Sequence, residues 1–212
     1  MSETLQTNIN FKNLGFNYLQ TKCFMMYKWK NDQWDQGKIC YDPLIQLHIM
    51  SGIFHYGQSL FEGLKAFKSK SGNILICNSN ANAERMRFGC RRLLMPEITD
   101  EMFNYAIDKV LLNNLEYIPP YVSGGCVYIR PFIFASGPKL GLGPSTEYTF
   151  IVLINPVGTY YSKKIKCRVV ENFDRAATFG VGNIKMGGNY AADMLPNITS
   201  KKMGYEIALY LD

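Results

Sequence analysis

The chain has 212 residues, of which 47% are hydrophobic and 14% aromatic, and its formal net charge is +6. This composition is typical of a packed protein and excludes a disordered or low-complexity chain. No stretch approaches the roughly 20 apolar residues of a membrane span, and the first residues resemble neither a signal nor a transit peptide. We therefore expect a soluble, cytoplasmic protein with no membrane partner. The basic residues are spread along the chain, so the charge does not predict nucleic-acid binding.

Metal and disulfide chemistry are not predicted. The 6 cysteines are far apart with no Cys-x-x-Cys pair, and the 2 histidines are His48 and His55. Zinc sites need closely patterned ligands, and disulfide frameworks are typical of small secreted chains. We expect neither here.

The N-terminal part is rich in strand and turn patterns. Residues 24–29 are aromatic and β-favouring, and residues 34–41 are expected to return as the partner strand of a hairpin after a turn at Asn31 and Asp32. A second unit of strand, turn and strand is expected over residues 60–77, with its first strand at 60–67.

Helical periodicity begins near Asn80, where Asn78 or Asn80 can act as the N-cap, and Pro96 ends the pattern. Thr99 is expected to cap a second helix, which ends before the Pro119–Pro120 pair. Two further strands are predicted at 126–130 and 148–154, separated by a loop rich in glycine and proline.

The pattern breaks around residues 155–162, which we interpret as a linker between domains. Beyond it we expect a strand at 165–170, a helix over 191–203 that ends at Gly204, and a buried strand at 207–211. The predicted architecture is an α/β fold with a small N-terminal domain (1–158), a linker (159–164) and the beginning of a larger domain (165–212).

Lys185 lies between two glycine pairs, and Tyr190 follows five residues later. Glycine allows backbone to approach a ligand closely because it has no Cβ and tolerates positive φ. A lysine held in this way can reach a bound carbonyl group and form a Schiff base. The alternative is a glycine-rich surface loop with a solvated lysine.

Four separated motifs carry a specific resemblance. They are residues 55–67, 82–86, 128–131 and 182–190, which read HYGQSLFEGLKAF, NAERM, YIRP and GNIKMGGNY. Their content and order resemble the branched-chain amino acid aminotransferases, which are pyridoxal 5′-phosphate enzymes of fold type IV. The resemblance runs from about Leu14 to the C-terminus. It implies transfer of the amino group of leucine, isoleucine or valine to 2-oxoglutarate, in a homodimer.

The resemblance also implies roles at the cofactor. Lys185 matches the Schiff-base lysine, which also moves the proton during catalysis. Tyr190 matches the tyrosine that hydrogen-bonds the cofactor O3′. Arg85 matches the arginine that holds the phosphate, for which a guanidinium fork is well suited. Arg175 matches a further arginine near the cofactor.

The implied substrate pocket accepts branched aliphatic side chains as well as glutamate. Tyr128 and Arg130 are two apart on a predicted strand and therefore share a face; they match the pair that receives the glutamate carboxylate. The resemblance assigns the other pocket positions to aromatic residues around the aliphatic group and to loop leucines that cross the dimer: Tyr56, Phe61, Tyr160, Leu140 and Leu142.

The sequence departs from the family pattern at its end. The glutamate that faces the pyridine nitrogen in the family has no match, because Asp193, Glu206 and Asp212 lie outside its motif. We therefore expect a C-terminally truncated enzyme, poorly folded beyond the first domain and inactive as residues 1–212. The alternatives are a non-catalytic remnant that binds a partner subunit, and a D-amino acid aminotransferase or aminodeoxychorismate lyase relative.

Overall fold

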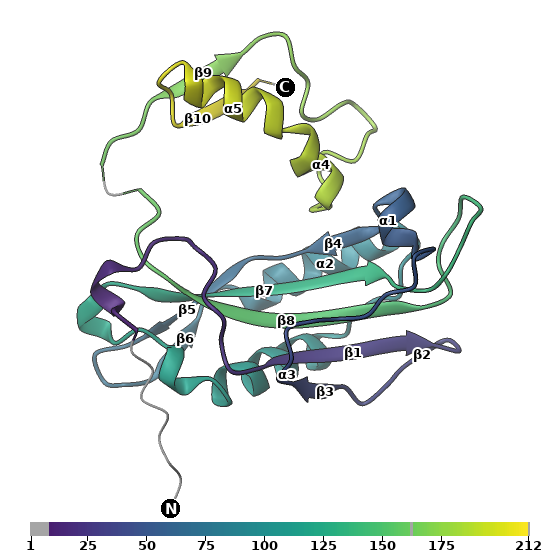
Figure 1. Cartoon of the computed structure of the whole chain (residues 1–212), viewed down its shortest axis with the longest axis horizontal. Helices are drawn as coiled ribbons and strands as arrows, with labels where there is room; N and C mark the ends of the chain where they lie inside the picture. The colour runs from purple at the N-terminus through teal and green to yellow at the C-terminus, as the bar shows by residue number, and fades with distance from the viewer. Residues whose placement is uncertain (1–8, 162, 212) are drawn as a thin grey trace, which may run out of the picture.

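The computed structural model describes residues 9–161 and 163–211. Its sheet body contains one layer of strands with helices packed on it, and a smaller lobe follows the last long strand (Figure 1). The strands of the sheet body are β1 (Phe24–Lys30), β2 (Gln33–Trp34), β3 (Lys38–Cys40), β4 (Ser59–Phe61), β5 (Leu64–Lys68), β6 (Ile74–Ile76), β7 (Cys126–Ala135) and β8 (Tyr148–Val157). Its helices are the 3-10 turns η1 (Phe11–Asn13), η2 (Leu115–Tyr117) and η3 (Tyr121–Ser123) and the α-helices α1 (Gly52–Tyr56), α2 (Ser79–Arg92) and α3 (Asp100–Leu112).

The strands of the body form a single 8-stranded antiparallel sheet with the order β2-β1-β8-β7-β5-β6. In addition, β3 pairs with β1, and β4 pairs with β7. The predicted hairpin is confirmed in part, because its return strand is divided into β2 and β3. The two central strands are longer than predicted and run to Ala135 and Val157, so Asn155, where the pattern was expected to break, still belongs to β8.

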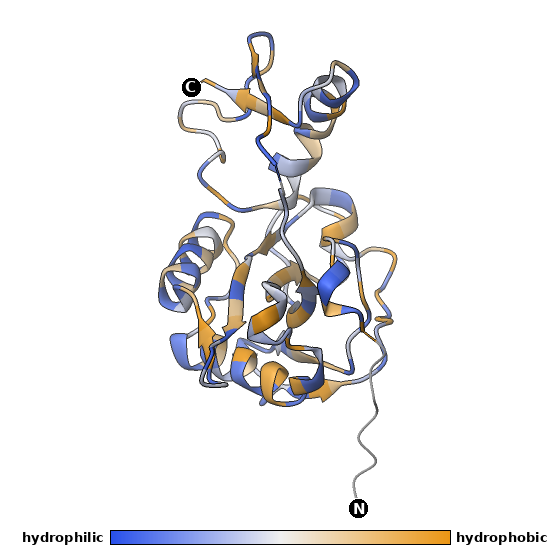
Figure 2. Cartoon of the chain, turned by 90° about the vertical axis from the view of Figure 1, so that its left-hand side faces the viewer, coloured by the Kyte–Doolittle hydropathy of each residue, from blue (hydrophilic) through white to orange (hydrophobic). Residues whose placement is uncertain are grey.

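The two faces of β7 have different surroundings. Val127, Ile129 and Ile133 belong to the buried core beneath α2 and α3. The intervening side chains, which include Tyr128 and Arg130, lie on the opposite face. This alternation follows from the two-residue repeat of a strand, and it separates the residues that stabilise the fold from those available for a ligand. In Figure 2, hydrophobic residues follow the strands of the body, and hydrophilic residues alternate with them along the helices.

The strand predicted at 60–67 is interrupted in the structure. It forms β4 and β5, which pair with β7 in one continuous register, since Phe61 lies opposite Phe132 and Leu64 opposite Ile129. At the break, the Glu62 N–H donates to the Pro131 carbonyl at 2.7 Å. Proline has no N–H with which to return the bond, which explains the local loss of pairing.

Both predicted helices of the body are present, but only one is capped as expected. The Thr99 side chain accepts a hydrogen bond from the Met102 N–H at 3.1 Å, as predicted. The residue before α2, Asn78, forms no side-chain cap, because it adopts a left-handed conformation with φ of 51°. That conformation is one that asparagine tolerates better than most residues.

The lobe contains β9 (Cys167–Val170), α4 (Gly187–Ala192), α5 (Met194–Lys202) and β10 (Ile207–Tyr210), and its two strands pair in parallel. The helix predicted over 191–203 is confirmed in part, because a break at Asp193 divides the helical residues between α4 and α5. Pro196 lies in the first turn of α5 and cannot donate to the carbonyl four residues earlier, so α4 and α5 are separate helices. The strand predicted at 207–211 is confirmed as β10, but its predicted burial is wrong, because Ala208 is the one buried residue of β10.

In both views the lobe lies above the sheet body and remains distinct from it (Figures 1 and 2). The predicted domain limits of 1–158, 159–164 and 165–212 stay a prediction. Within the described residues, no helix has the length and apolar character needed to cross a lipid bilayer.

Candidate active site

The segment before α4 brings Lys185 to the outer side of β4. The Phe61 N–H donates to the Lys185 carbonyl at 3.0 Å, on the side of β4 that faces away from β7. The preceding residue, Ile184, is 3% exposed and belongs to the core of the sheet body. The Asn189 side chain donates to the carbonyls of Val181 at 2.7 Å and Ile184 at 2.8 Å. One apolar anchor and these hydrogen bonds therefore position the lysine.

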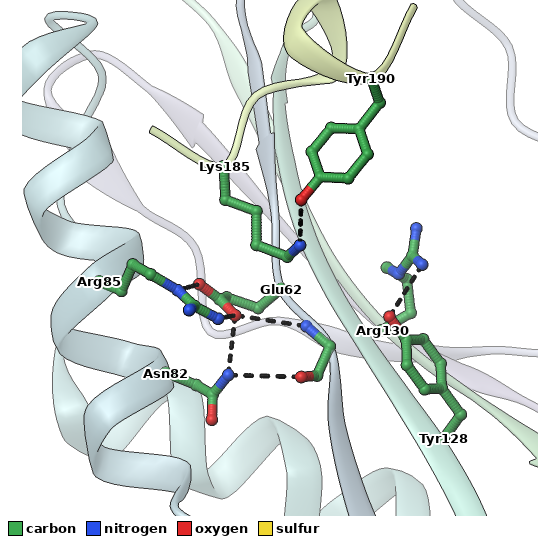
Figure 3. Close-up of polar contacts among 8 residues, drawn as sticks. Glu62, Asn82, Arg85, Tyr128, Arg130, Lys185 and Tyr190 are labelled. Carbon is green, nitrogen blue, oxygen red and sulfur yellow. Dashed lines mark hydrogen bonds and ion pairs between the residues drawn. The ribbon is translucent and has the colours of Figure 1, made fainter. Parts of the chain in front are cut away.

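The Lys185 amine faces two aromatic residues, Phe61 and Tyr190. Its Nζ donates to the Tyr190 hydroxyl at 2.5 Å (Figure 3). The same atom lies 4.5 Å from the centre of the Phe61 ring and 4.7 Å from that of the Tyr190 ring. A cation at this distance from a ring face is attracted to it. The structure thus brings together the lysine and the tyrosine singled out in the sequence.

Arg85 projects from α2 toward the other side of the same strand and is bound there by Glu62. Its Nε donates to Glu62 Oε1 at 2.7 Å, and its Nη2 donates to Oε2 at 2.6 Å (Figure 3). The hydrogen bond to Glu62 is the main cause that raises the pKa of Arg85, against a lowering by burial, and the charge of Glu62 adds to the rise. Arg85 therefore carries a fixed positive charge at this site.

Tyr128 and Arg130 share a face of β7, as predicted, and line a cavity of about 640 Å³ together with Phe61. Arg130 Nη2 donates to the Tyr128 hydroxyl at 2.9 Å. The Arg130 guanidinium carbon lies 4.6 Å from the centre of the Phe61 ring. Among the described residues, no carboxylate forms an ion pair with Arg130, and its buried Nε has no hydrogen-bond partner.

Gly63 is required for this arrangement. A Cβ atom at Gly63 would lie 2.0 Å from the Tyr128 hydroxyl. No real Cβ tolerates such a contact, so any larger residue would displace the Tyr128 ring from its position beside Arg130.

The remaining predicted site residues lie outside this group. Tyr56 donates its hydroxyl to the Leu140 carbonyl, and Leu140 and Leu142 are 79% and 87% exposed. Tyr160 packs against Phe16, a residue that lines the same cavity as Arg130. Arg175 is exposed and forms no hydrogen bond or ion pair with the rest of the described chain; its charge slightly lowers the pKa of Tyr210, which burial raises to about 12.

Two residues of the site were not assigned a role from the sequence. Glu62 is fully buried, and its Oε2 accepts a hydrogen bond from Asn82 Nδ2 at 2.8 Å. A signal was present in the sequence, since an acid that shares a strand face with Leu60 and Leu64 needs a partner. The partners come from α2, which packs over β4, and the sequence does not specify that packing.

Comparison with known proteins places this geometry in context. No protein-family model matches the chain. The branched-chain-amino-acid aminotransferase of Helicobacter pylori is 41% identical over 209 residues, which cover 97% of this chain and 62% of the relative. The corresponding protein of Haemophilus influenzae is 38% identical over 212 residues, which cover 97% of this chain and 62% of that protein. The chain therefore spans less than two thirds of the length of these curated relatives.

Solved structures agree with the sequence comparison. The branched-chain amino acid aminotransferase of Escherichia coli superposes with a TM-score of 0.68 at 25% identity, covering 88% of this chain and 59% of that one. The T.th. enzyme of the same name, complexed with N-(5′-phosphopyridoxyl)-L-glutamate, has a TM-score of 0.69 at 20% identity, covering 92% of this chain and 60% of its own. The fold expected from the resemblance is confirmed. Over nearly its whole length, the chain is similar in sequence to part of these branched-chain-amino-acid aminotransferases.

Proposed function

We propose that this chain is the pyridoxal 5′-phosphate-binding part of an aminotransferase that moves the amino group of leucine, isoleucine or valine to 2-oxoglutarate. The observation that carries the proposal is the contact between Lys185 Nζ and the Tyr190 hydroxyl at 2.5 Å, at the outer side of β4. Two bacterial relatives are branched-chain-amino-acid aminotransferases, and one structural neighbour is complexed with a phosphopyridoxyl derivative of glutamate.

The residues present fit this cofactor. Lys185 supplies the amine that binds a carbonyl group, and Tyr190 supplies a hydroxyl beside it. Arg85 supplies a guanidinium with an exposed side that suits a phosphate dianion. When bound, the cofactor supplies an electron sink for the reacting amino acid. Lys185 would then accept and return the proton at the substrate Cα, since its backbone carbonyl is held beside β4 by the Phe61 N–H and its amine is hydrogen-bonded to the Tyr190 hydroxyl.

Arg130 is the residue that we propose for the side-chain carboxylate of glutamate. Its Nε is buried without a partner among the described residues, and Tyr128 occupies only its Nη2. A buried donor that lacks a partner is costly, and a carboxylate in the cavity would satisfy it. The aromatic residues Phe61 and Phe132 of the same cavity suit a branched aliphatic side chain.

We further propose that the protein is a homodimer in which Leu140 and Leu142 extend into the neighbouring subunit. Leu140 and Leu142 are 79% and 87% exposed, so both leucines are available to a partner subunit. We also propose that Tyr56 and Tyr160 contribute to the aromatic walls of the substrate pocket and that Arg175 lies near the cofactor. A cytoplasmic location stays a prediction from the sequence.

Reductive trapping tests the proposal on the chain itself. Residues 1–212 are incubated with pyridoxal 5′-phosphate and reduced with borohydride, and the modified lysine is identified by peptide mapping. We expect the label on Lys185, and its loss in Lys185→Ala but not in Lys68→Ala, which removes an exposed lysine of β5. Label on another lysine would contradict the assignment. Absence of label would favour the non-catalytic alternative.

A further inference from the structure

Glu62 is a buried acid that the proposed reaction does not use. Its side chain is 0% exposed, and it lies on the face of the strand that packs against α2, between the core residues Leu60 and Leu64. Placing a carboxylate there is unfavourable unless its charge and its lone pairs are satisfied. The position therefore calls for an explanation beyond packing.

Three groups of donors satisfy the Glu62 carboxylate. Arg85 donates to both oxygens, at 2.7 Å from Nε and 2.6 Å from Nη2. Asn82 Nδ2 donates to Oε2 at 2.8 Å, and the Gly63 N–H donates to the same atom at 3.3 Å. Asn82 lies one helical turn before Arg85 on α2, so the amide holds the carboxylate from the side next to the guanidinium.

This pairing leaves one edge of the Arg85 guanidinium free. A guanidinium has five N–H donors in a rigid plane, and Glu62 takes the Nε edge. The edge formed by Nη1 and the outer N–H of Nη2 is not the one that binds Glu62, and 51% of the Arg85 side chain is exposed. Two parallel N–H donors of this kind are the geometry that binds a phosphate oxygen pair.

We propose that Glu62, supported by Asn82, is a positioning residue that fixes Arg85 with its outer edge toward the phosphate group of the cofactor. This inference rests on the proposed function, since it assumes that Arg85 contacts the phosphate. A free arginine would have to lose side-chain freedom on binding, whereas an arginine already held by Glu62 is oriented before the ligand arrives. Glu62 thereby contributes to phosphate affinity without touching the ligand.

The test compares ligands with and without a phosphate. Dissociation constants of pyridoxal 5′-phosphate and of pyridoxal are measured by absorbance titration for the full chain and its variants. In Glu62→Gln, we expect affinity for pyridoxal 5′-phosphate to fall about tenfold while that for pyridoxal is unchanged, because the amide nitrogen cannot accept from Arg85. The matched control is Glu97→Gln, which breaks the exposed 2.8 Å ion pair between Glu97 and Arg91. Arg91 lies on α2, as Arg85 does, and the control should change neither dissociation constant.

Further variants separate the two levels of the inference. Arg85→Ala should lower affinity for pyridoxal 5′-phosphate alone. If it does so and Glu62→Gln does not, the phosphate role of Arg85 stands and the positioning role is overturned. If Arg85→Ala leaves the ratio of the two constants unchanged, both roles are overturned.

A purely structural role of Glu62 gives a third result. Glu62→Gln would then weaken both ligands equally and lower the melting temperature seen by circular dichroism, which overturns the proposal. Should Glu62→Gln not fold, Asn82→Ala serves instead, since it keeps both charges and removes only the amide that supports the carboxylate. A loss of affinity confined to the phosphorylated ligand supports the proposal in either variant.

Discussion

Single residues of this protein are constrained by what lies across the strand from them. Gly63 has no side chain because the Tyr128 hydroxyl occupies the space where its Cβ would lie. Pro131 lies opposite Glu62 and cannot donate a ladder hydrogen bond. The pairing with β7 is therefore interrupted at the point where β4 ends and β5 has not yet begun. The motif residues Glu62 and Gly63 thus have separate purposes. One holds the arginine of α2, and the other leaves room for the tyrosine of β7.

The buried cysteine of α2 leads to a prediction about pH. Burial is the main cause that raises the pKa of Cys90 from 9.0 to about 12. The unfolded chain loses this thiol proton near pH 9, whereas the folded chain keeps it, so the stability contribution is complete below that pH and is lost as the pH rises toward 12. We expect the difference in unfolding free energy between the parent and Cys90→Ala to narrow by about 1.4 kcal/mol from about pH 8 to about pH 10.

Urea unfolding at several pH values checks this expectation. The matched control is Cys77→Ala, which removes an exposed cysteine and should show the same effect at each pH. A difference for Cys90→Ala that is constant over the range would mean that the thiol is not protected from ionisation in the folded state.

At the level of the elements, capping and proline decide where helices begin. Thr99 caps α3, and Asp100 and Glu101 follow in its first turn, where negative charge is favourable. We expect Thr99→Ala to lower the free energy of unfolding by about 1 kcal/mol, because the Met102 N–H loses its acceptor. Thr99→Ser keeps the hydroxyl and should retain most of the stability. Equal losses in both variants, measured by chemical denaturation, would show that the methyl group and not the cap is responsible.

Element prediction from sequence succeeded where a local signal sufficed. The Thr99 cap and the turn before Ile74 depend on residues close in the chain, and both elements are present. The break in the strand at Glu62 depends on Pro131, which is distant in sequence and adjacent in space. Pro196 was a local signal for the break between α4 and α5. The prediction followed the apolar pattern over residues 191–203 instead and therefore missed the break.

For the whole molecule, the connection between sheet body and lobe depends on few contacts. Ile184 is buried in the core of the body, and Val181 and Met186 pack against that core from the same segment. The neighbouring Lys185 carbonyl accepts from the Phe61 N–H. Lys185 therefore owes its position to the docking of a short segment and not to the lobe as a whole.

This arrangement predicts that Ile184→Ala releases the lysine segment from β4. Truncating a buried isoleucine removes about 2–5 kcal/mol of packing, which exceeds what one backbone hydrogen bond contributes. We expect hydrogen exchange at the Phe61 amide to accelerate at least about tenfold, with lower capture of pyridoxal 5′-phosphate. Ile198→Ala, a change at a half-exposed residue of the lobe, should leave both measurements unchanged. Unchanged exchange at Phe61 in Ile184→Ala would contradict this account.

The sequence alone singled out the lysine and tyrosine of the candidate site, the arginine of α2 and the pair on β7, because motif content and the two-residue repeat of a strand are local properties. It did not determine that Glu62 binds Arg85 and Asn82, or that Gly63 makes room for Tyr128. Those relations depend on how α2 packs over the strand and on which residues lie opposite in β7. Such contacts join residues far apart in the chain, and only the tertiary structure specifies them.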